Sequence, residues 1–240
     1  MCIFVALSQR DWYILGSNRD DQADRKTDTT VTYDSTRHCQ YVKDLQSWWT
    51  RLAVYDSWLY AVLLNHSPSV KKQVFPSRGE LPLSVIDLLL LNLSDWNIDK
   101  ILEHIDIKNY DSCVLAVWNI SKGVFTHHIL TWDAVNKSLD KKIATWNLFL
   151  AASTLYPEST HTLWAEDLEK ITDKKWLRWF METHRYNFDS SCCIPKIGTV
   201  TKSMSIIVYN LHNKDMMYDY YPNYVMGEYV YSNKINLIKE

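Results

Sequence analysis

The sequence is poor in glycine and carries no excess of basic residues. Only 5 of its 240 residues are glycine, and the net charge is -2, so no basic field indicates a nucleic-acid partner. The longest apolar stretch, VIDLLLLNL, contains Asp87 and is far too short to span a membrane. The first apolar run, CIFVAL, is too short for a signal core and has no basic segment before it. We therefore expect a soluble, cytoplasmic protein without a transmembrane segment.

The cysteines lack any regular spacing, and this argues against several kinds of site. The chain has five cysteines and no C-x-x-C pair, so neither a zinc site nor a thioredoxin motif is indicated, and we expect no resident metal or cofactor. An odd, irregular set fits a reducing compartment better than a disulfide framework. The five are Cys2, Cys39, Cys113, Cys192 and Cys193.

Tryptophan, by contrast, is abundant, and hydrophobic residues make up 47% of the chain. This is enough for a substantial core, and no linker interrupts the sequence, so we expect one domain over residues 1–240. The 11 tryptophans could line an apolar pocket for a flat ligand, or they could fill the core or an oligomer interface. The sequence leaves the oligomeric state open.

Apolar runs and turns predict four antiparallel hairpins interrupted by helices. Ser77 and Glu80 form a capping-box pattern before a helix over 81–93, with Pro82 tolerated in its first turn. Further helices are predicted near 97–105 and within 158–184, whereas 22–50 and 185–197 read as irregular. Clustered helices between hairpins indicate an α+β fold rather than βαβ alternation. The hairpins pair 2–8 with 12–18, 52–56 with 58–65, 113–120 with 124–132, and 199–210 with 215–221.

The first hairpin brings a polar cluster back to the start of the chain. With the turn centred near Arg10, residues that face each other have numbers that sum to about 20. This register places Cys2 opposite Asn18, with Arg19 and Asp20 just past the strand end, beside the N-terminus.

This arrangement resembles the parts of an N-terminal-nucleophile amidase. Because cysteine is small, removal of Met1 would leave Cys2 with a thiol and a free α-amino group that can act as its base. Arg19 would favour the thiolate, Asp20 could orient the amine or Arg19, and Asn18 could donate to a developing oxyanion. In the alternative interpretation, Cys2 is a small buried hydrophobe and the polar cluster is an ordinary strand-end turn.

Four motifs in order give the chain a family resemblance. MCIFVA followed by SNRDD is similar to the start of the NRDE family, also called the transport-and-Golgi-organisation protein 2 family. LAVYDSWLYAVLLNHS with SRGELP, then TWNLFLAASTLYPEST, and finally GTVTKSMSIIVYN resemble later segments of the same family. Together these motifs extend over most of the chain.

The resemblance implies a fold and a set of site residues. The expected fold is a four-layer αββα N-terminal-nucleophile hydrolase-like sandwich of two mainly antiparallel sheets. Cys2 would be the nucleophile of a cysteine amidohydrolase that cleaves a C–N bond of a small amide. Asn65 and Asn147 would be polar groups near the thiol, and Arg78 of the SRGE motif would bind substrate.

Two departures from the family pattern bear on the substrate. Asp21 stands where the family name has glutamate, and Trp48-Trp49 aligns with a pair of glycines found in many members. Two large rings in place of glycines predict a narrowed or reshaped pocket mouth, so we expect Trp48 or Trp49 to line the cleft over Cys2.

The family's links to membrane trafficking and intracellular haem movement supply an alternative function. In it the chain is a non-enzymatic carrier or chaperone of haem or another hydrophobic metabolite. His127 and His128 are neighbours on a predicted strand, so at most one of them faces any pocket. The thiolate pair Cys192-Cys193 is a possible haem ligand but is more often structural. His38 and His66 fall in predicted loops, where we expect them to be solvated.

Overall fold

The structure is a computed structural model, and it divides the chain into two compact units. One unit comprises Met1–Thr30 and Trp146–Glu240, and the other comprises Val31–Thr145. The single domain expected over residues 1–240 stays a prediction. The described residues are 2–9, 11–22, 24–26, 28, 30–46, 48–56, 59–66, 76–91, 98–121, 124–144, 148–152, 175, 177–178, 181, 195–196, 199–222 and 234–236.

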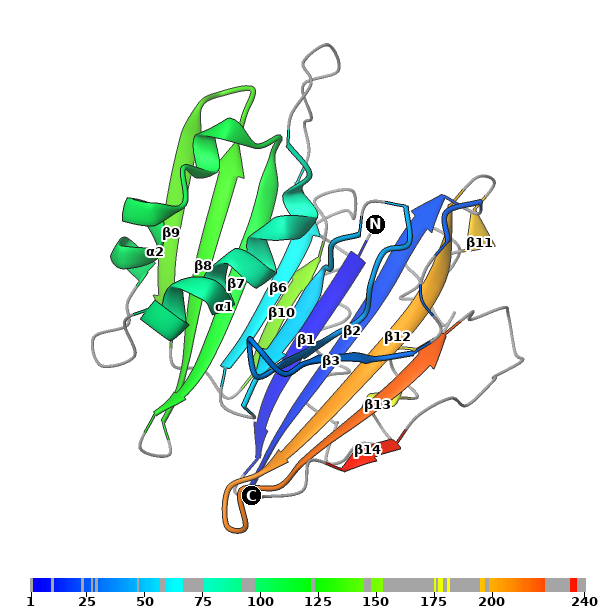
Figure 1. The fold of residues 1–240 in the computed structure, drawn as a ribbon. Coiled ribbons are helices and arrows are strands. Elements are labelled where there is room, and N and C mark those ends of the chain that lie inside the picture. Colours follow the sequence, from blue (N-terminus) through cyan, green and yellow to red (C-terminus); the bar gives the residue numbers. More distant parts are fainter. Residues whose placement is uncertain are drawn as a thin grey trace. The chain divides into compact units, whose positions relative to one another are not determined.

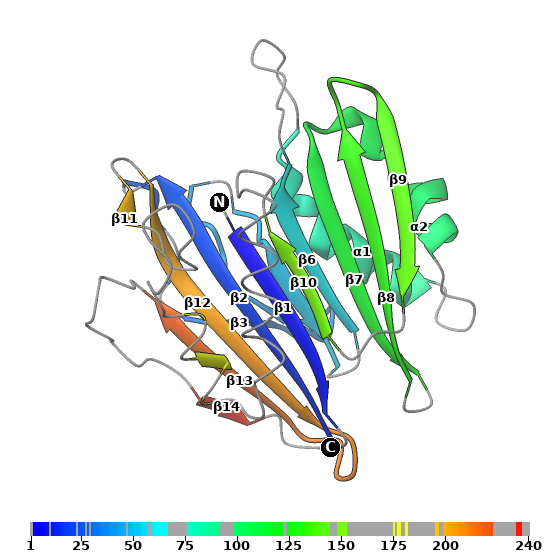
Figure 2. The same cartoon turned by 180° about the vertical axis from the view of Figure 1, so that it is seen from behind.

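The first unit is built on one antiparallel sheet of seven strands. Its order is β10-β1-β2-β12-β13-β14, and β11 pairs with β12 outside this path (Figure 1). The same sheet is seen from behind in Figure 2. Residues Ile3 to Leu7 of β1 are all buried, which explains why this strand is apolar at every position. The strands are β1 (Cys2–Gln9), β2 (Trp12–Gln22), β10 (Leu148–Ala152), β11 (Pro195–Lys196), β12 (Thr199–Asn210), β13 (Met216–Pro222) and β14 (Lys234–Asn236).

The register of the first hairpin differs by one residue from the prediction. Cys2 pairs with Arg19, and Ile3 pairs with Asn18. The prediction counted Gln9 as part of the turn, but β1 extends through Gln9, which pairs with Trp12. A shorter connection therefore shifts the whole ladder by one position.

The second unit carries a seven-stranded antiparallel sheet in which each strand neighbours the next along the chain, from β3 to β9. Helices α1 and α2 lie over one face of this sheet in both views (Figures 1 and 2). The elements are β3 (Thr32–Asp34), β4 (Cys39–Tyr41), β5 (Leu52–Tyr55), β6 (Leu59–Asn65), the 3-10 helix η1 (Arg78–Glu80), α1 (Leu81–Leu91), α2 (Ile98–His104), the 3-10 helix η2 (Ile107–Asn109), β7 (Cys113–Ser121), β8 (Val124–Asp133) and β9 (Ser138–Ala144).

The core of the second unit lies between this sheet and its helices. Alternate residues of the strands, such as Leu63, Leu115 and Leu130, pack with Leu81 and Ile101 of the two helices. A strand turns every second side chain toward the helices, and each helix turns an apolar stripe toward the sheet, so the two layers bury their apolar faces against each other.

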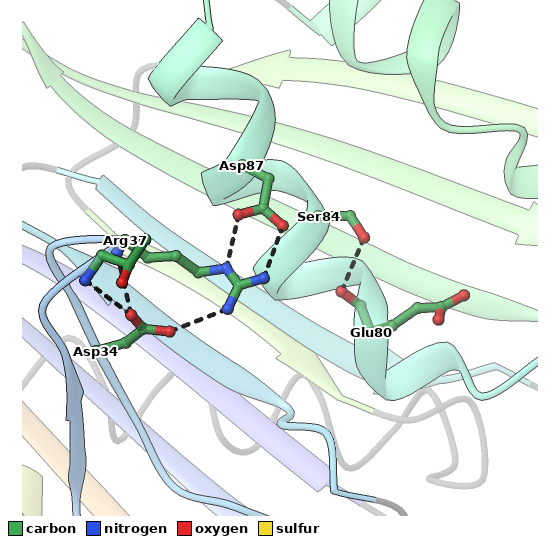
Figure 3. A network of polar contacts seen from close by, with 6 residues as sticks. Asp34, Arg37, Glu80, Ser84 and Asp87 are labelled. Atoms are coloured by element: carbon green, nitrogen blue, oxygen red, sulfur yellow. Dashed lines mark hydrogen bonds and ion pairs between the residues drawn. The ribbon is translucent and has the colours of Figure 1, made fainter.

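An arginine clasp joins the β3–β4 hairpin to helix α1 (Figure 3). Arg37 bonds both carboxylate oxygens of Asp87, at 2.6 and 3.1 Å, and reaches Asp34 at 3.0 Å. The pKa of Arg37 is raised mainly by its hydrogen bond to Asp87. Burial acts to raise the pKa of Asp34, but bonds from Arg37 and the Thr36 amide outweigh it and the pKa is lowered.

Most of the predicted elements are confirmed. The α+β class, the two mainly antiparallel sheets and all four hairpins are present. The segment 22–50 is not wholly irregular, because it contains the short hairpin β3–β4. Most of 158–184 lies outside the described residues, although Lys175, Leu177, Arg178 and Met181 are helical; Pro195–Lys196, in the predicted irregular segment 185–197, forms β11.

The capping box predicted before helix α1 is wrong in one respect. Ser77 is an N-cap, but it caps the 3-10 helix η1 and its side chain makes no capping bond. The Glu80 carboxylate accepts a hydrogen bond from the Tyr110 hydroxyl instead of closing back on Ser77. Pro82 is the second residue of α1, as expected for a proline in the first turn.

No helix among the described residues is long and apolar enough to cross a membrane.

Candidate functional site

The polar cluster Asn18–Asp21 lies at the end of β2, next to the start of β1 (Figure 1). Side chains of a strand alternate between the faces of a sheet, so Asn18 and Asp20 share one face while Arg19 and Asp21 share the other. Asn18 and Asp20 are almost fully buried, at 0% and 1% exposure. The four residues therefore form two separate polar pairs rather than one continuous patch.

The Asn18 face of β2 packs against the helical residues Leu177 and Met181. The Asn18 side-chain amide donates to the Met181 carbonyl at 3.0 Å. Two residues earlier, a Cβ added to Gly16 would meet the Leu177 side chain at 3.2 Å. Glycine at position 16 thus lets this segment approach β2, and Asn18 bonds its main chain.

Asp20 is held by a residue of the neighbouring strand β12. The Thr201 hydroxyl donates to the Asp20 carboxylate at 2.5 Å, and Thr201 is itself only 2% exposed. The two residues are direct partners in the β2–β12 ladder, and a bulge follows between Thr201 and Ser203. Bulges of this kind re-aim side chains and are common beside active sites.

Arg19 is paired with Asp21 on the opposite face. An Arg19 Nη atom lies 3.2 Å from the Asp21 carboxylate, and Arg25 approaches the same oxygen at 3.3 Å. The side chains of Arg19 and Asp21 are 11% and 9% exposed. Asp21, the departure from the family's glutamate, is therefore the carboxylate that binds both guanidinium groups.

Tyr220 on β13 lies within the electrostatic reach of Arg19. Burial raises its pKa to about 12, although a hydrogen bond with Ser203 and the charge of Arg19 act to lower it. Its hydroxyl donates to the Asp28 carbonyl at 3.0 Å. At neutral pH Tyr220 is therefore a neutral hydrogen-bonding group beside the arginine.

Cys2 stands at the first position of β1, where its Cα partner is Arg19. Asp20 follows Arg19 directly on β2. The hairpin thus brings together the main-chain positions of Cys2, Arg19 and Asp20. Two other thiols, Cys39 and Cys113, are free and buried, and burial raises the pKa of each to about 12.

The structure places Asn65 and Arg78 at one end of the sheet in the second unit. Asn65 is the last residue of β6 and pairs with Cys113. Arg78 donates to the Ser112 carbonyl at 2.5 Å and lies 3.6 Å from the Asp111 carboxylate. The two predicted residues therefore approach the same turn of chain before β7, whereas Asn147 lies outside the described residues.

The two adjacent tryptophans have different surroundings. Trp48 is 68% exposed and has a positive φ of 63°. Trp49 is partly buried against the helix–sheet core, and a Cβ added to Gly79 would lie 2.9 Å from the Trp49 Cβ. Trp49 thus packs inside the second unit, and the prediction that one of the rings lines a cleft over Cys2 stays a prediction.

The histidines considered as haem ligands are mostly enclosed. His127 is 1% exposed and meets the Trp118 ring edge-on, with 5.9 Å between ring centres. Burial lowers the pKa of His128 to about 4. His38 is exposed, as predicted, whereas His66 is partly buried and burial lowers its pKa. In the described part of the chain, no three His, Cys, Asp or Glu side chains gather as a metal site, and Cys192 and Cys193 lie outside it.

Comparison with known proteins identifies the family. The model of the family described as Transport and Golgi organisation 2 matches residues 1–179. The chain belongs to this family. A search of curated proteins finds no relative that matches it.

Solved structures of hydrolases share a distant likeness with this family member. One is an N-acylethanolamine-hydrolyzing acid amidase ortholog from Caenorhabditis elegans, with 10% identity over 86% of this chain and 92% of that chain, and a TM-score of 0.47. Two others are variants of the conjugated bile acid hydrolase from Clostridium perfringens. They have 10% and 12% identity, cover 99% and 98% of this chain and 92% of theirs, and have TM-scores of 0.49 and 0.48. Similarity at this level says nothing about the activity of the present chain.

Sequence reasoning missed the partners that hold the polar cluster. Thr201, Arg25 and Met181 contact Asp20, Asp21 and Asn18, yet none of the three was predicted as a site residue. For Thr201 a signal was present, because the strand TVTKSMSIIVYN begins with hydroxyl side chains before it becomes apolar. Arg25 and Met181 carry no comparable signal in the sequence.

Proposed function

We propose that this family member is a cysteine amidohydrolase of the N-terminal-nucleophile type, with Cys2 as nucleophile and a small amide as substrate. The observation that carries the proposal is the pairing of Cys2 with Arg19 at the start of β1, one position from the buried carboxylate of Asp20. A cation beside a thiol lowers its pKa, and a carboxylate beside an α-amino group can orient it.

In the proposed reaction, the α-amino group of processed Cys2 accepts the thiol proton. The thiolate attacks the amide carbonyl carbon, and the C–N bond breaks as the α-ammonium returns the proton to the leaving amine. A water molecule then hydrolyses the thioester, releasing a carboxylic acid and restoring the thiol. Each cycle consumes one amide and one water and needs no oxidant or reductant.

The surrounding residues support distinct roles in this proposal. Arg19, held by Asp21, favours the thiolate, and Asp20, held by Thr201, orients the α-amino group. One amide N–H of Asn18 is committed to Met181, so in the proposal Asn18 anchors β2. The roles predicted for Asn65 as a polar group and for Arg78 as a substrate-binding group stay part of the proposal.

The proposal is tested with chromogenic amides. The intact mass of protein made in its native host is first measured by mass spectrometry, which shows whether Met1 is removed. It is then incubated with a series of N-acyl p-nitroanilides of increasing chain length, and p-nitroaniline release is followed by absorbance. We expect turnover with at least one member, and an acyl adduct on the peptide that begins at Cys2.

Two variants serve as controls for this experiment. Cys2→Ala should abolish both turnover and the acyl adduct, whereas Cys39→Ala, which removes a buried thiol from β4, should retain both. A retained Met1, or equal turnover by Cys2→Ala, would refute the proposal. The alternative of a haem or hydrophobic-metabolite carrier has no specific observation among the described residues in its favour and stays a prediction.

A further inference from the structure

We propose that Thr201 is a positioning residue that fixes the Asp20 carboxylate beside the start of the chain. The inference rests on the proposed function, because it assigns Asp20 to the α-amino group of processed Cys2. It adds a residue from β12, almost two hundred positions away in sequence, to the machinery of the first hairpin.

The contact itself is short and lies away from water. The Thr201 hydroxyl is 2.5 Å from an Asp20 carboxylate oxygen, and the two residues are 2% and 1% exposed. A hydrogen bond between a hydroxyl and a carboxylate is among the stronger kinds, and burying a carboxylate is costly unless such bonds satisfy it. Thr201 therefore both stabilises the ionised form of Asp20 and fixes the direction of its carboxylate.

The β-bulge after Thr201 explains how the hydroxyl is aimed. Thr201 is opposite Asp20, and Ser203 is opposite Arg19, so Lys202 and Ser203 together oppose one residue of β2. In a regular strand Thr201 and Ser203 would share a face. Without the bulge, the register from Ser203 onward would place Lys202 opposite Asp20, so the bulge is what makes Thr201 the partner of this carboxylate.

Charged residues on the elements that flank this contact are Arg19 and Asp21 on β2, Lys202 on β12, Asp219 on β13, and the helical residues Lys175 and Arg178. Asp219 pairs with Ile206, further along β12 than Thr201, and the Arg178 guanidinium lies 4.8 Å from the centre of the Tyr221 ring. Replacing Thr201 leaves these charges and the α-amino group of processed Cys2 unchanged, so a changed Asp20 titration reports the lost hydrogen bond.

The first measurement follows Asp20 directly. Carboxyl carbons are titrated by NMR in the processed wild type, in Thr201→Val, which keeps the shape but loses the hydroxyl, and in Thr201→Ser, which restores it. We expect the Asp20 titration to move upward by about one pH unit in Thr201→Val, since the ionised form loses a donor, and to return in Thr201→Ser. An unchanged titration in Thr201→Val overturns the inference.

The second measurement follows Cys2 with iodoacetamide as the probe. The pH profile of alkylation at Cys2 should change in Thr201→Val and return in Thr201→Ser, because Asp20 orients the α-amino group that accepts the thiol proton. Ser205→Ala is the matched control, because it removes another buried hydroxyl of β12, one that lies 3.1 Å from the Tyr218 hydroxyl, and should leave both profiles unchanged. An equal shift in Ser205→Ala would reduce Thr201 to a structural role and overturn the inference.

The two proposals fail in different ways. If Cys2 of the wild type is alkylated no faster than cysteine in a short peptide, the proposed function is refuted, whatever Asp20 does. If Cys2 is reactive but its profile and the Asp20 titration are the same in Thr201→Val as in wild type, only the role of Thr201 is refuted.

Discussion

Arginine and aspartate meet in both units of the chain, and the two clusters differ in their exposure to water. Arg19 and Asp21 at the end of β2 are 11% and 9% exposed, whereas Arg37 and Asp87 of the clasp in Figure 3 are 34% and 46% exposed. A more exposed ion pair contributes little to the free energy of unfolding, and a structural role in holding one element against another is enough to explain it. Buried charges are costly to keep, so the cluster beside Cys2 is the better candidate for a site.

The same contrast separates the thiols, and it gives the largest expected effect. Burial raises the pKa of Cys39 and Cys113 to about 12, so their thiolate fractions at pH 7.5 are about a thousandfold below that of an ordinary cysteine. We expect iodoacetamide to alkylate them about a thousandfold more slowly than a cysteine peptide, as measured by peptide mapping. Unfolding in urea should remove the difference. Rapid labelling of either thiol in the folded protein would break the comparison.

Histidine provides a second contrast, in the pH dependence of stability. Because burial lowers the pKa of His128 from 6.5 to about 4, the unfolded chain binds its proton first as the pH falls. The stabilising effect of the neutral ring is complete above pH 6.5 and is lost progressively toward pH 4. Between pH 7 and pH 4 we expect the wild type to lose about 3 kcal/mol more than His128→Leu, as measured by urea unfolding.

The exposed His104 supplies the control for this measurement. His104→Gln should follow the wild type at every pH. The same loss of stability in His128→Leu as in the wild type would mean that other groups cause the acid sensitivity of this unit.

The arginines themselves test the comparison most directly. Arg19→Met leaves the largely enclosed Asp21 with one guanidinium partner fewer, and we expect it to lower the free energy of unfolding by about 3 kcal/mol. Arg37→Met removes the clasp, which is more exposed than the Arg19 cluster, and we expect a loss of about 1 kcal/mol or less. Both are measured by urea unfolding at pH 7 and low salt. Equal losses would show that burial does not distinguish the two clusters.

Much of the fold could be predicted from the sequence, because many strands and turns have a recognisable local pattern of apolar and turn residues. Apolar runs on either side of a Ser-Lys-Gly turn predict the hairpin 113–120 with 124–132, which the structure confirms. The strand β9, SLDKKIA, is so polar that its pattern predicts no strand. In the part of the chain that the structure describes, β9 pairs with β8 alone, and its lysines are typical of a sheet edge. Pattern alone also misplaced Cys2 by one residue, because the length of the turn at Gln9 sets the register.

The support of the candidate site depended on long-range contacts, which a single sequence does not reveal. Thr201 reaches Asp20 only because β12 pairs with β2 and carries a bulge at that point. Arg25, which follows β2 in the chain, binds the same Asp21 carboxylate as Arg19. The family resemblance pointed to the residues of the first hairpin, but it did not identify these neighbours.

The smallest expected effect concerns two adjacent tryptophans, where burial again decides the outcome. Trp48 holds a left-handed backbone conformation that favours glycine, and its ring is 68% exposed. We therefore expect Trp48→Gly to leave the free energy of unfolding unchanged or raise it by up to about 1 kcal/mol. Trp49→Gly, the matched change one residue on, should cost about 3 kcal/mol because Trp49 packs on the core. Urea unfolding compares the two, and a loss above 1 kcal/mol in Trp48→Gly would mean that the exposed indole makes a stabilising contact.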